Sequence, residues 1–245
     1  MTTINLHQLR IPVDGDADQP LQDYSTKIAS PKMDSMEVIF RNQEQRLLKL
    51  IKEFKNGGIF GCIAWLTSFP VLKALASCKN VSIIVQKEDF LRPDINIKNT
   101  VRWKADLWTL YNGITCEMER HQFKSPMGDL SFAAGTQVDG IRCVGNHNYE
   151  KLSAFPRAHN KFLVFCKVKN ENDKTEYNPV AVWTGSYNIT KTSTESFENV
   201  LYFTDLSGSN AIINAYLMEH HQIFALSEPL NWESVWTSPE FRIGS

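Results

Sequence analysis

The fold class of the chain follows from the apolar run Ile59-Phe60-Gly61-Cys62-Ile63-Ala64-Trp65-Leu66. A short continuous run of this kind is typical of a strand that is buried on both faces. A short helix follows, capped by Thr67 or Ser68, and Val81-Ser82-Ile83-Ile84-Val85 forms a second buried strand. The three segments predict a βαβ unit with parallel strands, a right-handed connection and helices over both faces of the sheet.

Downstream of this unit, the sequence predicts further strands and helices. Strands are expected at 141–144, 161–165, 180–183 and 200–204, and helices at 99–111 and 209–226. Two segments between them are expected to be irregular, a long surface loop at 125–140 and an exposed hairpin loop at 167–179. The whole pattern predicts an α/β protein with a mixed, largely parallel sheet flanked by helices on both faces.

Upstream of the unit, residues 1–33 are polar and rich in turn residues, which predicts an irregular N-terminal arm. Residues 34–245 are expected to form one domain. Its first helix is predicted to begin at Asp34 or Ser35 and to end at Asn56-Gly57-Gly58.

Composition excludes several classes of protein. The chain has 245 residues, a net charge of −1 and 42% hydrophobic residues, so it is neither disordered nor globally basic. It has no apolar run long enough to cross a membrane and no secretion signal at its start, so we expect a soluble, cytoplasmic protein. Its five cysteines are scattered without a C-x-x-C pair, which predicts buried thiols rather than a zinc site.

The chemistry of the chain is concentrated in three stretches. They are Ala158-His159-Asn160-Lys161, Gly185-Ser186-Tyr187-Asn188-Ile189-Thr190 and Ser196-Phe197-Glu198-Asn199. Because side chains two apart on a strand share a face, His159 and Lys161 are expected to point the same way. An ammonium, a hydroxyl and an amide suit a phosphate group, and a histidine can act as nucleophile or acid/base near neutral pH.

Glu198 is the residue that we expect to orient the histidine. A carboxylate at the start of the strand predicted at 200–204 can accept a hydrogen bond from an imidazole N–H and favour the charged ring. His147 lies in a polar loop shortly before the first stretch, where it could line the cleft, but a plain surface position is favoured. The strand aromatics Phe60 and Trp65 are expected to lie in the core rather than to stack on bases.

These stretches resemble the motifs of the phospholipase D superfamily, H-x-K-x4-D followed by G-S/T-x-N and a glutamate. His159 and Lys161 match the first motif, Ser186 and Asn188 the second, and Glu198 the glutamate. The resemblance covers about residues 34–226 and implies a phospholipase D-like single lobe. The family's aspartate is replaced by Cys166, and the segment at 167–179 lengthens the gap between the motifs.

The resemblance implies a metal-independent phosphodiesterase without a cofactor, in which one histidine forms a phosphohistidine and a second one protonates the leaving oxygen. His159, Lys161 and Glu198 are then the catalytic residues, and Lys161, Ser186 and Asn188 bind the phosphate. Because the chain has one H-x-K motif and the reaction needs two histidines, we expect a homodimer with the active site on its two-fold axis.

Charge favours nucleic acid as the substrate. Between residues 141 and 191 the chain has eight basic and four acidic residues, a local charge of +4. The first interpretation is therefore a nuclease that cleaves DNA or RNA. A phospholipid phosphodiesterase is less favoured, because the sequence has no evident membrane anchor. The third alternative, suggested by Cys166 and the insertion, is a degenerate member that binds nucleic acid or protein without turnover.

Overall fold

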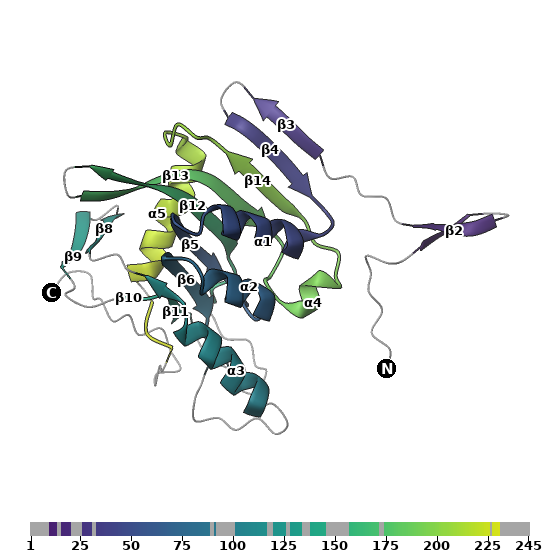
Figure 1. Cartoon of the computed structure of the whole chain (residues 1–245), viewed down its shortest axis with the longest axis horizontal. Helices are drawn as coiled ribbons and strands as arrows, with labels where there is room; N and C mark the ends of the chain where they lie inside the picture. Colours follow the sequence, from purple (N-terminus) through teal and green to yellow (C-terminus); the bar gives the residue numbers. More distant parts are fainter. Residues whose placement is uncertain are drawn as a thin grey trace.

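The computed structural model describes most of the chain between residues 10 and 230 (Figure 1). The described ranges are 10–13, 16–20, 26–30, 33–88, 91, 101–116, 120–125, 128–133, 138–145, 157–171, 174–225 and 227–230. His147 lies outside them.

A ten-stranded mixed sheet forms the centre of the described part, in the order β10-β7-β6-β5-β12-β13-β14-β4-β3 with β11 beside β6. Its strands are β3 (Thr26–Ser30), β4 (Met33–Ile39), β5 (Gly58–Ile63), β6 (Asn80–Gln86), β7 (Thr115–Cys116), β10 (Val138–Asp139), β11 (Ile141–Val144), β12 (Lys161–Glu171), β13 (Lys174–Gly185) and β14 (Val200–Thr204). The pairs β5–β6 and β11–β6 are parallel, whereas the other strand pairs of this sheet are antiparallel. The predicted α/β fold with a mixed sheet is confirmed, but "largely parallel" was wrong, because the βαβ unit fixes only the local pairing.

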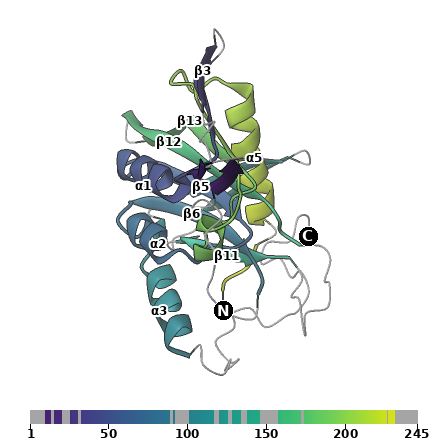
Figure 2. The same ribbon diagram turned by 90° about the vertical axis from the view of Figure 1, so that its right-hand side faces the viewer.

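Helices cover both faces of this sheet, as predicted (Figure 2). They are α1 (Gln43–Glu53), α2 (Phe69–Leu75), α3 (Val101–Asn112), the short α4 (Lys191–Thr194) and α5 (Ala211–Ala225). α1, α2 and α3 lie on one side of the sheet and α5 lies on the other.

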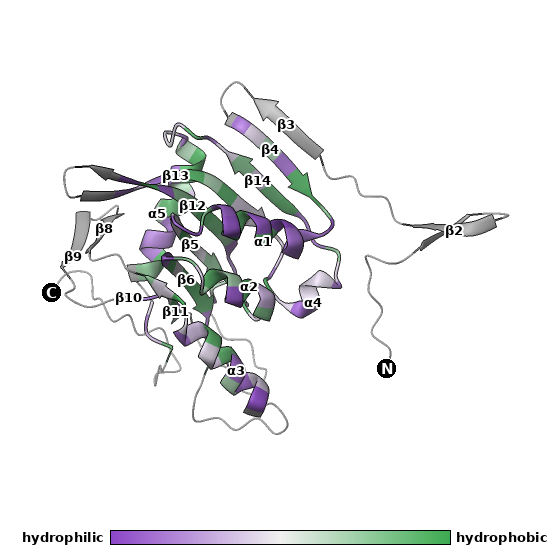
Figure 3. Cartoon of the chain, viewed as in Figure 1, coloured by the Kyte–Doolittle hydropathy of each residue, from purple (hydrophilic) through white to green (hydrophobic). Residues whose placement is uncertain are grey.

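The two faces of β5 explain why its sequence is apolar throughout. Ile59 and Ile63 pack into the cluster that contains α1 and α2, whereas Phe60 and Cys62 pack into the cluster that contains α5. Every residue of β5 is therefore buried, and the central strands are the most hydrophobic part of the ribbon in Figure 3.

The predicted irregular arm contains three strands. β1 (Arg10–Val13) pairs with β2 (Asp16–Pro20), and β3 pairs with β4 at the edge of the main sheet. The prediction of an irregular segment was wrong here, because pairing between neighbouring strands satisfies the backbone without an apolar pattern. Residues 33–39 form β4 rather than the start of a helix, and α1 begins after Asn42, whose φ is 58°.

The two segments that were expected to be irregular contain strands. β8 (Arg120–Ser125) pairs with β9 (Gly128–Ala133) at the start of the segment expected to be a loop. The hairpin predicted between the strands at 161–165 and 180–183 is confirmed, but its strands are longer than expected, since residues 167–171 belong to β12 and residues 174–179 to β13. The helices at 99–111 and 209–226 and the four predicted strands are confirmed, with shifts of a few residues at some ends.

All five cysteines are buried free thiols, as predicted. Burial raises the pKa of the Cys78 thiol to about 11, so this thiol stays protonated at neutral pH. Among the described residues, no helix has both the length and the apolar character that a membrane crossing requires.

Candidate active site

Four strand ends meet at one edge of the sheet and bring the three motif stretches together. β12 begins with Lys161, which lies opposite Ile63, the last residue of β5. β13 ends at Gly185, which lies opposite Val200, the first residue of β14. Because β12 and β13 are neighbours, the residues just before β12, just after β13 and just before β14 share this edge.

His159 lies in the segment that leads into β12, and its side chain is exposed. The backbone on both sides of it is held. The Ala158 N–H donates to Oε1 of Gln86 at 2.6 Å, and the carbonyl of Asn160 accepts from the Ala64 N–H at 2.9 Å. No residue that the structure describes makes a hydrogen bond to the exposed imidazole.

Positive charge surrounds this histidine. Lys161, partial burial and Arg157 all lower the pKa of His159, in that order of size. The lowered pKa favours the neutral imidazole at neutral pH, which is the form that can act as a nucleophile or base.

The Lys161 side chain is held beside the histidine. Its Nζ donates to the carbonyl oxygen of His159 at 2.9 Å. Burial lowers the pKa of Lys161, while the nearby Glu198 carboxylate raises it. The ammonium has further donors beyond this one hydrogen bond, so it can also bind an anion at the strand end.

The turn after β13 depends on glycine. Gly185 has a φ of 156°, and a Cβ there would collide with the carbonyl oxygen of Asn199 on the adjacent chain segment. The close approach lets Ser186 pair with Asn199 in both directions. The Ser186 N–H donates to the Asn199 carbonyl at 3.0 Å, and the Asn199 N–H donates to Ser186 Oγ at 3.1 Å.

Glu198 is bound to this serine. Its Oε2 accepts a hydrogen bond from Ser186 Oγ, and its backbone carbonyl accepts from Nε2 of Gln43 at 3.0 Å. The structure therefore places the Glu198 carboxylate with Ser186 and near Lys161. The structure has no hydrogen bond between Glu198 and His159, so the orienting role of Glu198 stays a prediction.

Asn188 differs from the other motif residues because it is buried, with 8% of its surface exposed. Its Oδ1 has no hydrogen-bond partner within the described part of the chain. The next residue fixes the loop to the end of β5. The Ile189 N–H donates to the carbonyl of Trp65 at 3.1 Å, and the Ile189 carbonyl accepts from the Thr67 N–H at 2.8 Å. Phosphate binding by Asn188 stays a prediction.

The two departures from the family motif lie away from this edge. Cys166 is five residues along β12 from Lys161, which is about 17 Å at the usual rise of a strand. It packs with Phe60, Phe162 and Val164 on the face that α5 covers, whereas Ile63, the partner of Lys161, belongs to the other face. The ribbon at 167–179 continues β12 and β13 still farther from the site (Figure 1).

Two residues at this edge were not predicted from the sequence. The first is Gln86, a buried residue that ends β6 and fixes the segment carrying His159. The second is Glu88, whose Oε1 accepts from Trp65 Nε1 at 2.9 Å and from Arg157 Nη2 at 3.4 Å. The only sequence feature that points to them is a pair of polar residues just after an apolar strand, which marks the carboxyl end of β6.

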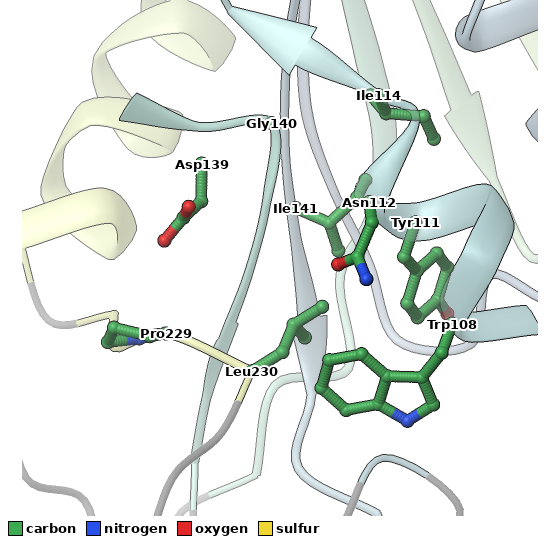
Figure 4. A pocket seen from close by; sticks show the side chains of 9 residues that line it. All are labelled: Trp108, Tyr111, Asn112, Ile114, Asp139, Gly140, Ile141, Pro229 and Leu230. Atoms are coloured by element: carbon green, nitrogen blue, oxygen red, sulfur yellow. The ribbon is translucent and has the colours of Figure 1, made fainter. Parts of the chain in front are cut away.

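A cavity of about 440 Å³ lies elsewhere, beside β11 and the end of α3 (Figure 4). Its lining consists of Trp108, Tyr111, Asn112, Ile114, Asp139, Gly140, Ile141, Pro229 and Leu230. None of the motif residues contributes to it. Within the described ranges, no three His, Cys, Asp or Glu side chains are grouped so that they could hold a metal ion.

The fold and this edge define an α/β protein with a site of histidine, lysine, serine and glutamate where four strands end. The chain is 34% identical over 213 residues to the uncharacterized protein L381 of Acanthamoeba polyphaga mimivirus, covering 82% of this chain and 69% of that protein. The chain belongs to the family of this viral protein. It matches no protein-family model.

Two solved structures are similar to the chain at low sequence identity. One is the phospholipase D family member Nuc from Salmonella typhimurium, with a TM-score of 0.44, 17% identity, and coverage of 84% of this chain and 97% of that one. The other is NucT from Helicobacter pylori, with a TM-score of 0.45, 14% identity, and coverage of 78% and 96%.

Proposed function

We propose that this protein is a phosphodiesterase that cleaves nucleic acid through a covalent intermediate on His159. The observation that carries the proposal is the exposed imidazole beside the Lys161 ammonium, at a strand edge that also presents Ser186. Such a group of donors suits the oxygens of a phosphodiester, and the lowered pKa of His159 keeps the ring neutral for attack.

In the proposed reaction, a ring nitrogen of His159 attacks phosphorus and the bond from phosphorus to one ester oxygen breaks. The leaving oxygen takes a proton from a second histidine. Water then attacks the phosphohistidine and gives a proton to that second histidine, and the nitrogen–phosphorus bond breaks. The product carries a terminal phosphate, and both histidines return to their starting states.

In this proposal, Lys161, Ser186 and Asn188 stabilise the negative charge on the non-bridging phosphate oxygens. In this proposal the Glu198 carboxylate positions the Ser186 hydroxyl and keeps Lys161 charged, since it is hydrogen-bonded to the first and raises the pKa of the second. The charge that the reaction develops is thus met by side chains of the protein itself. The proposal needs no metal ion and no cofactor.

The second histidine is assigned to another copy of the chain. The chain has one H-x-K motif, and His159 is exposed at the edge of the sheet, where an identical surface could approach it across a two-fold axis. We therefore propose a homodimer with one phosphate site between the two His159 side chains.

The test is cleavage of a labelled oligonucleotide in excess EDTA. The wild-type protein is expected to cleave it, and His159→Ala is expected to abolish cleavage. Lys161→Met should lower kcat/KM by about 100-fold or more, as expected for loss of a charge-stabilising donor. The matched control is Lys167→Met, an exposed lysine on the same strand beyond Cys166, which should stay within about twofold of wild type.

Denaturation at alkaline pH during turnover should trap a nucleotide on the wild-type protein but not on the His159→Ala variant. Cleavage that disappears with EDTA, or that persists in His159→Ala, contradicts the mechanism. Equilibrium sedimentation gives the mass of the particle, and a strictly monomeric active protein contradicts the shared site.

A further inference from the structure

Trp65 is an exposed aromatic residue at the candidate site. The sequence predicted a core residue, because the indole directly continues the buried run of β5. The structure contradicts this prediction for Trp65, since 36% of its surface is exposed, whereas Phe60 is buried as predicted. The reason is that β5 ends at Ile63, so Trp65 extends past the edge of the sheet.

Backbone pairing brings the segment that carries this indole next to the segment that carries the proposed nucleophile. Lys161 lies opposite Ile63, and the hydrogen bond from the Ala64 N–H to the Asn160 carbonyl continues the pairing by one residue. Trp65 directly follows Ala64 and His159 directly precedes Asn160, so this hydrogen bond brings the two segments together.

The indole is held in a fixed position. Its Nε1 donates to Glu88 Oε1 at 2.9 Å, and its backbone carbonyl accepts from the Ile189 N–H at 3.1 Å. Because the polar nitrogen is already bonded, the exposed part of the side chain is aromatic ring surface. The same Glu88 oxygen accepts from Arg157 Nη2 at 3.4 Å, so the carboxylate links a guanidinium to the indole.

We propose that Trp65 is a stacking platform for an unpaired nucleobase next to the phosphate bound at His159 and Lys161. The inference rests on the proposed function and narrows its substrate to single-stranded nucleic acid. In a duplex, neighbouring bases cover each base face, whereas a single strand can turn a base onto an aromatic side chain. Arg157 adds a positive charge for the backbone on the same side.

The test compares wild type, Trp65→Ala and Trp65→Phe on a short single-stranded thymidine oligonucleotide and on the same strand with abasic sites around the scissile phosphate. Trp65→Ala is expected to weaken binding and lower kcat/KM for the thymidine strand by about 5- to 100-fold, the range for loss of one stacked base. The abasic strand should change by less than about twofold, because it has phosphates but no base to stack. Trp65→Phe should recover most of the loss.

The matched control is Leu206→Ala, which removes an exposed apolar side chain at the far end of β14 and should leave both substrates unaffected. Equal losses on the base-bearing and abasic strands, or no loss on either, overturn the platform. So does a Trp65→Ala protein that changes from dimer to monomer, since Trp65 then belongs to an interface between copies.

A binding measurement separates this inference from the proposed function. Thymidine strands should quench tryptophan fluorescence in wild type, and the quenching should be largely lost in Trp65→Ala. If wild type binds in this way but cleaves nothing, the platform stands and the phosphodiesterase proposal fails. If it cleaves both strands equally well with or without Trp65, the phosphodiesterase stands and the platform fails.

Discussion

Replacing Cys166 by aspartate restores the phospholipase D motif in the sequence, and the structure predicts that the change harms the protein without helping catalysis. Cys166 is fully buried in the apolar cluster under α5, and burial raises the pKa of its thiol well above the ordinary value. A carboxyl group placed there would meet the same apolar surroundings. It would also lie about 17 Å along β12 from Lys161, too far to touch the phosphate.

The size of the effect follows from the pKa of the new carboxyl group. If burial raises that pKa from about 4 to about 7, the unfolded chain releases the proton at a lower pH than the folded protein does. Stability therefore falls as the pH rises between these two values. The loss from ionisation is about 1 kcal/mol at pH 4.5 and about 4 kcal/mol at pH 7.5, against a typical total stability of about 5–15 kcal/mol.

Urea denaturation of Cys166→Asp and Cys166→Asn at both pH values measures this difference. The two side chains have nearly the same shape, but the asparagine cannot ionise, so it controls for the cost of burying a polar group. The free energy of unfolding of the two variants should differ by about 1 kcal/mol at pH 4.5 and by about 4 kcal/mol at pH 7.5. Equal stabilities at pH 7.5, or a gain of phosphodiesterase activity in Cys166→Asp, would refute the placement of Cys166 away from the site.

Two further predictions test the surroundings of the site. Arg157→Gln removes a positive charge that lowers the pKa of His159, so the pKa of His159 should rise. The acid limb of the pH profile of kcat/KM should then move to higher pH, and an unchanged limb would mean that His159 does not titrate in the free enzyme. Gly185→Ala puts a Cβ against the Asn199 carbonyl at a φ of 156°, so urea denaturation should show a loss of at least about 2 kcal/mol, whereas Gly113→Ala, where a Cβ makes only ordinary contacts, should change stability by less than about 1 kcal/mol.

Local patterns in the sequence predicted the elements that are locally determined. The βαβ unit of β5, α2 and β6 was predicted from two apolar runs and a capping residue, and Ser68 does accept a hydrogen bond from the Val71 N–H at the start of α2. The pairing of β12 with β5 joins residues far apart in the chain, such as Lys161 and Ile63, and no local pattern encodes it. The sequence therefore predicted the central strands β5, β6, β11, β12, β13 and β14 but gave the wrong balance of parallel and antiparallel pairs.

The same distinction applies to the site. The motif spacing predicted which residues lie at the ends of β12, β13 and β14, because each stretch adjoins a strand that could be recognised. It could not predict that Glu88 joins Trp65 to Arg157, since these partners are 23 and 69 residues away in the chain. For the same reason, the continuous apolar run at 59–66 predicted a buried position for Trp65, which is exposed in the structure.

The charges around His159 bear on how the two His159 side chains of the proposed dimer could act, one as nucleophile and the other as acid. In one chain, Lys161 and Arg157 both lower the pKa of His159, so the neutral form is favoured and two such rings on a two-fold axis would both begin as bases. The proposed reaction needs one neutral ring and one charged ring. A bound phosphodiester brings a negative charge to both, and one proton shared between the two rings then stabilises the complex. The pair should therefore take up a proton when substrate binds, and the substrate itself would create the acid that its leaving group requires.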